Sequence, residues 1–546
     1  MYILSLLVIQ VKSKNTFKIP RSVVVYCCIL LCFGLLPVRL LYLNLTHEQV
    51  SSATNSKSII LSQSRGIIYD KNMQPLAGSY EKTASVVKPT VNALVSLKRV
   101  LDTDAFNAVS NELQKSNPVL LNIGNSLDCT DVVTVPVYKR YNNERIASHI
   151  IGYLDSGETH GISGIEKSFD EYLNSCRGEL RARFFVDANG GFLYGADVEI
   201  VNNNYHNCGG VVLTLEKDKQ LALEEAMDIC GIEKGAAVML NVNTGAVAAM
   251  VSRPDFDRNN ISAAMNNEKL PLFNRVLGSY PIGSVFKPLV AAAALEDGCD
   301  PADEYCCNGY VNVGSNTFRC TASHGKVNMA AAIAYSCNCY FVNLIEKTGA
   351  ENVIDSANEL GFGESLTMAE GISTYSGYLP AINELDSPSA RALFSFGQGS
   401  ITANILQVAS LYSAIAAGGK YSVPYLVEGL IDEKGEMLEK HEAKAPYRVF
   451  SEKTADLLSA FLELAVREGT GKNAAVENIR VCGKTATAQT GSFSDSNEKL
   501  VTWFAGFYPY EKPEYVLVVM CEGGISGSED CAPVVSKAVN KILNNK

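Results

Sequence analysis

An uncharged apolar run near the N-terminus constrains the fold of this chain more than any other feature. Residues 22–38 read SVVVYCCILLCFGLLPV, and RLLYL extends the run to residue 43. A helix of this length is just long enough to cross a bilayer. Four basic residues precede the run, namely Lys12, Lys14, Lys18 and Arg21. Because the segment after the run is nearly neutral, the positive-inside rule places the bulk of the chain outside the cytoplasm.

We therefore expect residues 1–21 to form a cytoplasmic tail and residues 22–43 to form one membrane-spanning anchor in the cell membrane. A cleavable signal peptide is the alternative, but no small-residue cleavage site follows the apolar run closely. A net charge of −11 and the lack of a basic stripe argue against a nucleic-acid partner, because phosphate binding needs clustered lysine and arginine.

The remaining chain is too long for one compact core, so two domains are expected outside the membrane. Residues 44–208 are mixed and rather polar, with short alternating strands. The Gly- and Asn-rich stretches DANGGF and VNNNYHNCGG close this region and predict a domain boundary. Residues 209–546 have a different texture and are predicted to form the second domain.

The second domain is predicted to be of the α+β class. GAAVMLNVNTGAVAAMVS, residues 235–252, predicts a hairpin that turns at residues 243–245. Strand patterns return in IRVCGKTATAQ, LVTWFAGFYP and YVLVVMCE, and a final helix follows in APVVSKAVNKIL. Ala-rich helical segments lie between, around residues 284–297, 328–347 and 402–418. A sheet built from both ends of the domain with helices inserted between its strands is an α+β layout.

The chain has sixteen cysteines, of which three lie in the apolar run. The other thirteen are an odd number, so at least one thiol stays free or pairs between molecules. An external location permits disulfides, and we predict one between Cys307 and Cys320, which flank a turn-rich segment. A zinc site of Cys306, Cys307, Cys320 and His324 is the less favoured alternative, because adjacent cysteines rarely chelate one ion well.

The segment SYPIGSVFKP places Ser284 and Lys287 three residues apart at the start of a predicted helix. A serine hydroxyl is a poor nucleophile until a base removes its proton. A lysine on the same helix face can serve as that base if its pKa falls, which burial or a second cation would cause. The alternative is a serine N-cap followed by a solvated lysine.

Other chemistries fit the sequence less well. None of the six histidines has a convincing Ser-His-Asp context, and no G-x-S-x-G elbow surrounds Ser284. GKT at residues 483–485 resembles the end of a phosphate-binding loop, but Asn478 stands where that loop needs glycine.

Two further motifs complete an ordered set with Ser284 and Lys287. Ser336, Cys337 and Asn338 form S-x-N between two helical segments, and Lys484 and Thr485 begin a K-T motif on a predicted strand. The order S-x-x-K, S-x-N, K-T-G is typical of penicillin-binding proteins and class A β-lactamases. Each motif alone is weak, but the ordered set is specific.

On these motifs the chain resembles the class B penicillin-binding proteins, membrane-anchored D,D-transpeptidases that cross-link peptidoglycan. The resemblance covers nearly everything after the anchor, and its pedestal part is more similar to the division and sporulation branch than to the elongation branch. Further segments that carry it are SRGIIYDKNMQPLA, GISGIEKSFDEYL, VSRPDFDRN, FSFGQGSITANILQVASLYSAIAAGG, WFAGFYP and CAPVV. It implies a penicillin-binding transpeptidase domain, similar to serine β-lactamases, in residues 209–546 and an elongated pedestal in residues 44–208.

The resemblance also implies a role for each motif residue. Ser284 would attack the carbonyl between two terminal D-alanines, and Lys287 would take its proton. Ser336 would relay a proton to the leaving amine, while Lys484 keeps the local field positive. The remaining roles are substrate binding by Asn338, Thr485, Thr487 and Gln398, and an oxyanion hole formed by the backbone N–H groups of Ser284 and Thr487.

Two positions depart from the family's pattern. Ala486 stands where the K-T-G motif has glycine, and we expect its methyl group to point away from the cleft and to change little. Met73 replaces the usual glycine of the pedestal signature. Within GISGIE, Glu166 is expected to form a salt bridge that holds the pedestal to the catalytic domain.

The resemblance implies stem peptides and β-lactam antibiotics as ligands, no cofactor and no metal. Its implied protein partners are a SEDS-family glycosyltransferase and other division proteins in the membrane. Two rival functions remain. A β-lactamase would need a deacylating carboxylate and water, and a β-lactam sensor or division scaffold would acylate without turnover or only recruit partners.

Overall fold

The structure is a computed structural model, and it describes residues 20–46, 55–115, 117–121, 129–142, 144–187, 189–193, 196–494 and 497–544. Most of the predicted cytoplasmic tail, residues 1–19, lies outside the described residues.

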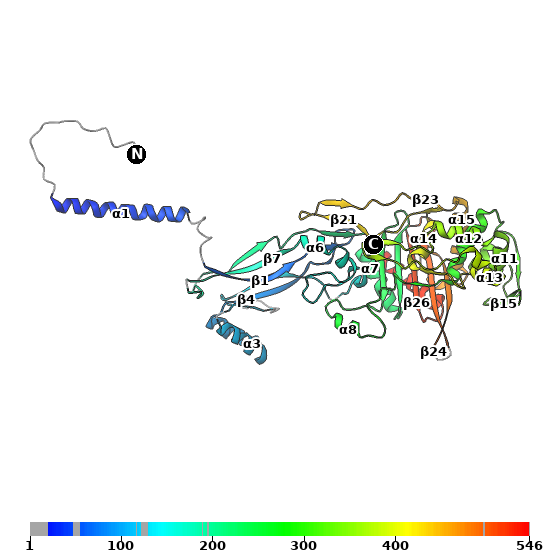
Figure 1. The fold of residues 1–546 in the computed structure, drawn as a ribbon, viewed down its shortest axis with the longest axis horizontal. Helices are drawn as coiled ribbons and strands as arrows, with labels where there is room; N and C mark the ends of the chain where they lie inside the picture. The colour runs from blue at the N-terminus through cyan, green and yellow to red at the C-terminus, as the bar shows by residue number, and fades with distance from the viewer. Residues whose placement is uncertain are drawn as a thin grey trace, which may run out of the picture. The chain divides into compact units, whose positions relative to one another are not determined.

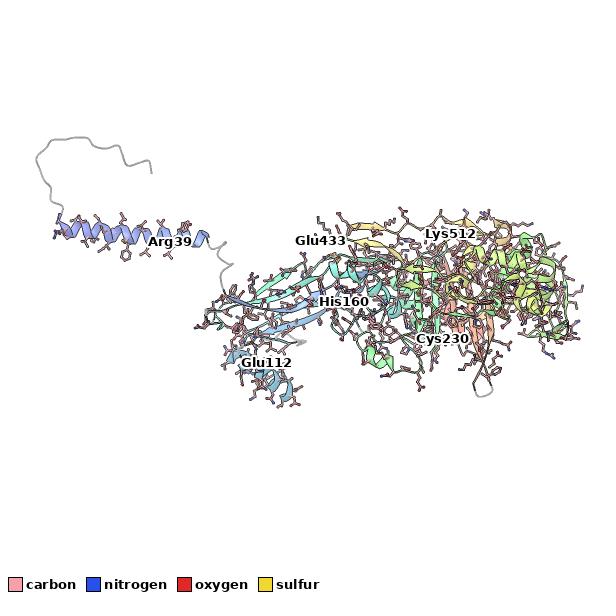
Figure 2. All side chains as sticks on the ribbon, in the orientation of Figure 1. Arg39, Glu112, His160, Cys230, Glu433 and Lys512 are labelled. Carbon is pink, nitrogen blue, oxygen red and sulfur yellow. The ribbon has the colours of Figure 1, made fainter. Side chains whose placement is uncertain are left out.

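The apolar run forms helix α1 (Arg21–Thr46), which contains Pro37. Its segment Arg21–Tyr42 has a mean hydropathy of 2.4 and is not buried by any other part of the chain. The side chains of α1, Arg39 among them, point outward around the helix (Figure 2). Among the described residues α1 is the one helix that is long and apolar enough to cross a membrane.

The chain divides into two compact units. The first comprises residues 1–59, 88–119 and 181–201, and the second comprises residues 60–87, 120–180 and 202–546. Helices α2 (Val91–Leu97) and α3 (Thr103–Gln114) lie in the first unit. The predicted boundary after residue 208 does not coincide with this division and stays a prediction.

A five-stranded antiparallel sheet forms the centre of the second unit. Its order is β11 (Val247–Arg253), β10 (Gly235–Asn241), β26 (Tyr515–Glu522), β25 (Asn497–Tyr508) and β24 (Cys482–Ser494). The hairpin predicted at residues 243–245 joins β10 to β11, and Gly245 takes the positive φ of 76° that this turn needs. Strands from both ends of the predicted domain therefore meet in one sheet, as the α+β prediction expects.

Helices cover both faces of this sheet, which explains why its strands β10, β11 and β26 are largely apolar along their length rather than alternating. On one face Ala237 and Met239 pack with α7 (Lys217–Ile229) and α16 (Ala532–Asn544). Their neighbours in β10, such as Val238, pack on the other face with α9 (Lys287–Glu296) and α14 (Ile405–Ala416). Figure 1 shows α14 and α15 beside the strands that include β24 and β26.

A second five-stranded sheet joins segments that are distant in the sequence. Its order is β22 (Met437–Lys440), β21 (Val427–Ile431), β9 (Gly210–Leu213), β2 (Ile67–Tyr69) and β3 (Pro75–Ala77). β2 runs parallel to β9, and β21 runs antiparallel to it. The pedestal signature thus shares a sheet with strands of the predicted catalytic domain.

The turn between β2 and β3 explains the glycine that the pedestal signature usually carries. Met73 has a φ of 62°, in the left-handed region where a side chain is disfavoured. The Asp70 carboxylate holds the turn by accepting hydrogen bonds from the backbone N–H groups of Asn72, at 2.8 Å, and Gln74, at 2.7 Å.

Glu166 is fully buried in a cluster of charges inside the pedestal sequence. Its carboxylate accepts hydrogen bonds from Arg65 Nε at 3.1 Å, Arg140 Nε at 2.7 Å and the Tyr141 hydroxyl at 2.8 Å. Both arginines lie within residues 44–208, so the expected salt bridge to the catalytic domain is wrong. Such a buried carboxylate needs partners this close, because desolvation of an unpaired charge costs several kcal/mol.

The remaining elements are shorter or connect the sheets. The helices are α4 (Ser148–Ile151), α5 (Gly164–Ser168), α6 (Asp170–Ser175), α8 (Ile261–Met265), α10 (Met329–Ala334), α11 (Asn338–Thr348), α12 (Ala350–Glu359), α13 (Pro388–Ser395) and α15 (Glu452–Arg467). The strands are β1 (Ser56–Ser64), β4 (Tyr80–Val87), β5 (Val119–Leu121), β6 (Val132–Lys139), β7 (Gly178–Phe185), β8 (Glu199–Asn203), β12 (Ser279–Pro281), β13 (Tyr305–Cys307), β14 (Tyr310–Val313), β15 (Asn316–Arg319), β16 (Gly325–Val327), β17 (Thr367–Ala369), β18 (Ile372–Ser373), β19 (Thr402–Asn404), β20 (Lys420–Tyr421) and β23 (Tyr447–Arg448).

Candidate active site

Ser284 lies in a short 3-10 helix, η1 (Gly283–Phe286), that leads directly into α9. The backbone N–H of Lys287 donates to the carbonyl of Ser284. Residues three apart are eclipsed in a 3-10 turn, so the hydroxyl of Ser284 and the amine of Lys287 share one side of the helix. Ser284 is half-buried and Lys287 is completely buried, so this lysine is not a solvated surface residue.

The Lys287 amine is held by the S-x-N motif. Its Nζ lies 2.8 Å from the carbonyl oxygen of Ser336, 3.1 Å from the Ser336 hydroxyl and 2.7 Å from Asn338 Oδ1. Burial lowers the pKa of Lys287 to about 7. A substantial fraction of the amine is therefore neutral near pH 7, as a general base must be.

The S-x-N motif occupies the break between α10 and α11. Ser336 has a φ of 58°, and a non-glycine residue in this region is rare and strained. Asn338 is the first residue of α11, and its side-chain N–H donates to the carbonyl of Arg319 at 3.0 Å. The strained turn thus presents both polar side chains of the motif to Lys287.

Strand β24 carries the third motif at the edge of the central sheet. Lys484 is fully buried, and its Nζ donates to the Thr485 carbonyl at 2.9 Å. Burial and the charge of Lys287 lower the pKa of Lys484 well below its usual range. Thr487 is exposed, whereas the hydroxyl of Thr485 bonds to Thr470 Oγ1 at 2.7 Å. Thr470 has no part in the three motifs, so its contact with Thr485 could not be predicted from them.

Two glycines bring η1 against its neighbours. The backbone N–H of Gly283 donates to the carbonyl of Gly397 at 2.9 Å, which places the loop that contains Gln398 beside the Ser284 turn. On the side of β24, a Cβ on Gly283 would lie 3.2 Å from the Cβ of Ala488 and 3.4 Å from that of Ala486. The structure therefore brings Ser284, the S-x-N turn, β24 and the Gln398 loop together around Lys287.

The same contact accounts for the alanine in the third motif. Ala486 is buried, and its methyl group faces the position where Gly283 lacks a side chain. Thr485 and Thr487 alternate with it and take the opposite side of the strand, because successive side chains of a strand point to opposite faces. The methyl group therefore fills space beneath the Ser284 turn rather than crowding the exposed side of β24.

The cysteines near this site are free in the structure. Cys307 Sγ and Cys320 Sγ lie 3.7 Å apart without a bond between them, so the predicted disulfide stays a prediction. Cys307, Cys320, His324 and Cys337 form a cluster of potential metal ligands. Cys306, which the less favoured zinc site included, is exposed and is not part of this cluster. Cys337 was not among the metal ligands predicted from the sequence, and its place inside the S-x-N motif was the only feature that singled it out.

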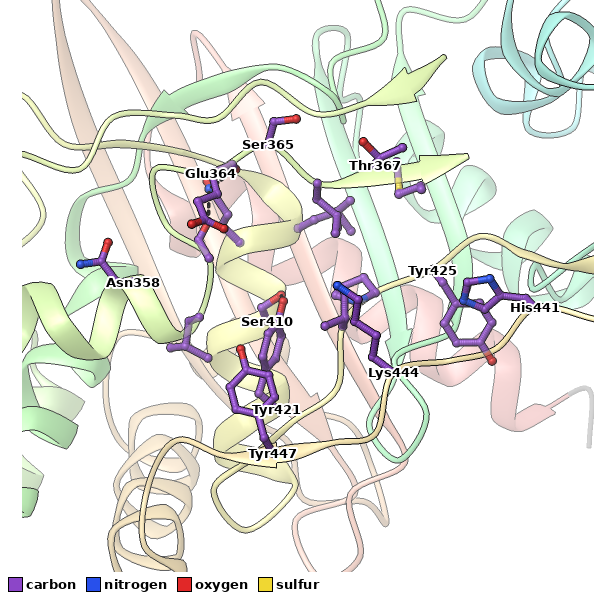
Figure 3. Close-up of a pocket in the computed structure, with 18 of the residues that line it drawn as sticks. Asn358, Glu364, Ser365, Thr367, Ser410, Tyr421, Tyr425, His441, Lys444 and Tyr447 are labelled. Atoms are coloured by element: carbon purple, nitrogen blue, oxygen red, sulfur yellow. Dashed lines mark hydrogen bonds between the residues drawn. The ribbon is translucent and has the colours of Figure 1, made fainter. Parts of the chain in front are cut away.

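A cavity of about 530 Å³ lies elsewhere in the second unit. Its lining includes Ser410 of α14, Tyr421, His441 and Lys444 (Figure 3). None of the predicted site residues lines this cavity, so it is separate from the site around Lys287 and Lys484.

The short helix η1, which carries Ser284 and leads into the buried Lys287, packs against β24, which carries the buried Lys484. This arrangement fits an enzyme that transfers an acyl group through a serine. The model of the penicillin-binding protein transpeptidase domain matches residues 235–543. The chain belongs to this family and is a class B penicillin-binding protein.

Curated relatives and a solved structure agree with this assignment. The chain is 28% identical over 526 residues to stage V sporulation protein D of Bacillus subtilis, and the match covers 89% of this chain and 79% of the relative. It is 26% identical to peptidoglycan D,D-transpeptidase MrdA of Haemophilus influenzae, over 98% of this chain and 93% of the relative. A structure described as a peptidoglycan synthase complex that coordinates polymerization and crosslinking shares the fold, with a TM-score of 0.69, 24% identity, and coverage of 96% of this chain and 99% of the other.

Proposed function

We propose that this chain is a serine D,D-transpeptidase that cross-links peptidoglycan stem peptides through an acyl-enzyme on Ser284. The family assignment supports this reaction class, and related proteins bear the name peptidoglycan D,D-transpeptidase. The observation that carries the proposal is the buried Lys287 amine, one helical turn from a half-buried serine and with its pKa lowered to about 7.

In the acylation step the neutral Lys287 amine takes the proton of the Ser284 hydroxyl as its oxygen attacks the carbonyl between two D-alanines. The negative oxygen of the tetrahedral intermediate accepts hydrogen bonds from the backbone N–H groups of Ser284 and Thr487. Such an oxyanion hole is commonly worth a hundredfold or more in rate. Ser336, whose hydroxyl is 3.1 Å from Lys287 Nζ, passes its proton to the leaving D-alanine amine and takes in exchange the proton that Lys287 accepted from Ser284.

Substrate binding uses the free edge of the central sheet. An extended peptide can add to an edge strand through backbone hydrogen bonds, so the stem peptide lies along β24. Thr485 and Thr487 bind the terminal carboxylate, while Asn338 and Gln398 contact the peptide on the other side. Two buried lysines disfavour each other's charge, and the incoming carboxylate supplies the counter-charge that lets Lys484 stay protonated.

In the second step an amine from a neighbouring stem peptide attacks the acyl-enzyme and takes the acyl group, which regenerates the Ser284 hydroxyl. β-Lactams react with the same serine because they present a strained amide to it. A similar structure, penicillin-binding protein 3 of Mycobacterium tuberculosis, is complexed with aztreonam.

The protein partners are proposed to be a SEDS-family glycosyltransferase and other division proteins in the membrane. Structures similar to this chain include the peptidoglycan synthase complex above and a complex between a penicillin-binding protein and MreC from Helicobacter pylori. Stage V sporulation protein D of Bacillus subtilis, a relative that matches 89% of this chain, supports the division and sporulation branch.

Intact-mass spectrometry of the full-length chain in detergent with benzylpenicillin tests the proposal. We expect a stable penicilloyl adduct on the native chain and on a Ser356→Ala control in α12, and no adduct on Ser284→Ala. An adduct on Ser284→Ala, or none on the folded native chain, would contradict the mechanism. Rapid loss of the adduct would instead indicate a β-lactamase, and acylation without transfer from a thioester substrate would indicate a sensor or scaffold.

A further inference from the structure

Four metal-ligating side chains converge beside the S-x-N motif. They are Cys307 at the end of β13, Cys320 after β15, His324 before β16 and Cys337 immediately before α11. One ligand atom from each lies within 4.8 Å of those of all the others. Cys320 and His324 share the loop between β15 and β16, whereas Cys307 and Cys337 come from other elements, so the fold brings the three segments together.

Three of the six distances between these atoms match the edges of a tetrahedron around zinc. Zn–S bonds of about 2.3 Å and Zn–N bonds of about 2.0 Å in tetrahedral geometry put sulfurs about 3.8 Å apart and sulfur about 3.5 Å from nitrogen. The Cys307–Cys320 and Cys320–Cys337 sulfur pairs are 3.7 and 3.8 Å apart. The Nδ1 atom of His324 is 3.5 Å from Cys307 Sγ.

The backbone around the cluster provides the second indication. Cys320 Sγ accepts from the N–H groups of Asn338 at 3.1 Å and Cys339 at 3.3 Å. The N–H of Tyr340 points to Cys337 Sγ at 3.4 Å, and that of Gly309 points to Cys307 Sγ at 3.4 Å. A neutral thiol is a weak acceptor, whereas a metal-bound thiolate is stabilised by such donors. The backbone is therefore arranged for three thiolates.

We propose that Cys307, Cys320, Cys337 and the Nδ1 atom of His324 bind one zinc ion in a closed structural site. Binding would release the three thiol protons, and the three thiolates with one neutral imidazole leave a net charge of −1 on the complex. Three sulfurs and one nitrogen suit zinc better than harder divalent ions.

The site has a consequence for the active site, which rests on the proposed function. Cys337 stands between Ser336 and Asn338, the two residues that contact Lys287 Nζ. A metal bond to Cys337 would fix the strained turn at Ser336 and hold both side chains against the amine. Cys337 is thus a positioning residue for Ser336 and Asn338.

The metal content of the purified chain tests the site directly. The full-length protein, carrying a tag without histidines, is isolated in detergent without oxygen, and its metals are measured by mass spectrometry. We expect one zinc per chain for the native protein and for Cys306→Ser, the exposed neighbour outside the cluster. Cys337→Ser and His324→Ala should lose most of the zinc. X-ray absorption at the zinc edge should show three sulfurs and one nitrogen.

Absence of zinc in the native chain, together with no uptake from added ZnCl₂ by the reduced protein, would overturn the proposal. So would equal zinc loss from Cys306→Ser and Cys337→Ser, or a Cys307–Cys320 disulfide in freshly isolated, metal-free protein. If the variants fail to fold, the native chain is stripped with a chelator and refilled with Co²⁺. Visible absorption typical of tetrahedral cobalt thiolate is then expected, and octahedral cobalt absorption would contradict the site.

The link to catalysis has a separate readout. Chelation should slow penicillin acylation about tenfold or more, and zinc should restore it. Zinc bound with the expected ligands in a chain that never acylates would refute the proposed function and leave the metal site standing. Full acylation by the metal-free chain would refute the positioning role of Cys337.

Discussion

Single residues decide whether the Ser284 site can work, and the surroundings of Lys287 are the most informative. Its amine is enclosed by the Ser336 and Asn338 oxygens and by the ring of Phe341, whose centre lies 5.4 Å from Nζ. Cys320, Cys337 and Cys339 are the titratable groups that influence the pKa of Lys287. The charge of Lys287 in turn lowers the pKa of Lys484. Burial outweighs the cysteines, which raise the pKa of Lys287 when ionised, and its pKa falls to about 7.

This lowered pKa predicts how acylation depends on pH. Only the neutral amine can accept the Ser284 proton, and its fraction increases as pH rises through 7. The rate of penicillin acylation should therefore rise about tenfold between pH 6 and pH 8 and then level off. Stopped-flow or quenched mass-spectrometric rates across this range would measure it.

An arginine at the same position stays protonated, so Lys287→Arg should lose at least about a hundredfold in acylation rate at every pH. Lys512→Arg, at an exposed position, is the matched control and should keep the native profile. A pH-independent rate in the native chain would mean that Lys287 is not the base.

The alanine at position 486 gives a second prediction at this scale. Its methyl group faces Gly283 and not the exposed side of β24, so Ala486→Gly should leave the acylation rate within about threefold of native. The added backbone freedom should cost about 0.5–1 kcal/mol of stability. Acylation rates and denaturant unfolding would measure both effects, and a rate gain above tenfold would show that the methyl group obstructs the ligand.

The residues of the site could be predicted from sequence only where a motif is contiguous. Ser284 with Lys287, and Ser336 with Asn338, sit at fixed short spacings, so their types alone indicate shared faces and turns. The contact between Gly283 and Ala486 could not be predicted, because it joins residues that only the folded sheet brings together. The same holds for Cys307 and Cys337, whose distance depends on how three short hairpin strands fold against α11.

At the scale of elements, the hairpin β2–β3 shows how an unfavourable residue is tolerated. Asp70 caps the turn through two backbone N–H groups, and its second carboxylate oxygen accepts from Lys217 N–H at 3.1 Å. These bonds hold Met73 at its positive φ, although a left-handed conformation costs a side chain roughly 1–2 kcal/mol. The element persists because its neighbours fix the turn.

Met73→Gly should therefore stabilise the fold. The glycine removes the left-handed penalty, and its greater freedom in the unfolded chain offsets part of the gain, so the expected net effect is up to about 1 kcal/mol. Thermal unfolding should show a higher Tm for Met73→Gly. The control is Met437→Gly on strand β22, where no positive φ is needed, and this variant should lower the Tm. If Met73→Gly also lowered the Tm, the backbone at Met73 would not be strained.

Whether a segment forms a helix or a strand could be predicted best where its apolar pattern is long. The β10–β11 hairpin and helix α14 lie where the patterns place them, because their burial is continuous. The partners of β9 were not evident, since a four-residue apolar strand does not specify whether β2, β21 or another strand lies beside it.

At the scale of the whole molecule, the question is which side of the membrane the large second unit occupies. Helix α1 has the length and hydropathy of a single span, and the basic residues that precede it favour a cytoplasmic N-terminus. Stem peptides and penicillin are encountered outside the membrane, so the proposed function requires the same orientation. The natural cysteines of the chain allow a test without new reporters.

In intact protoplasts that express the full-length chain, a membrane-impermeant maleimide should label the exposed Cys208 and Cys306. Cys27, Cys28 and Cys32 lie within α1 and should stay unlabelled, because the bilayer excludes a charged reagent. Peptide mass spectrometry would assign each labelled site, and Cys208→Ser with Cys306→Ser should remove the corresponding signals. Labelling of Cys208 only after lysis would place the second unit in the cytoplasm, where it could not reach its proposed substrate. Because α1 is the one described helix able to span a membrane, that single result would fix the orientation of the described residues that follow it.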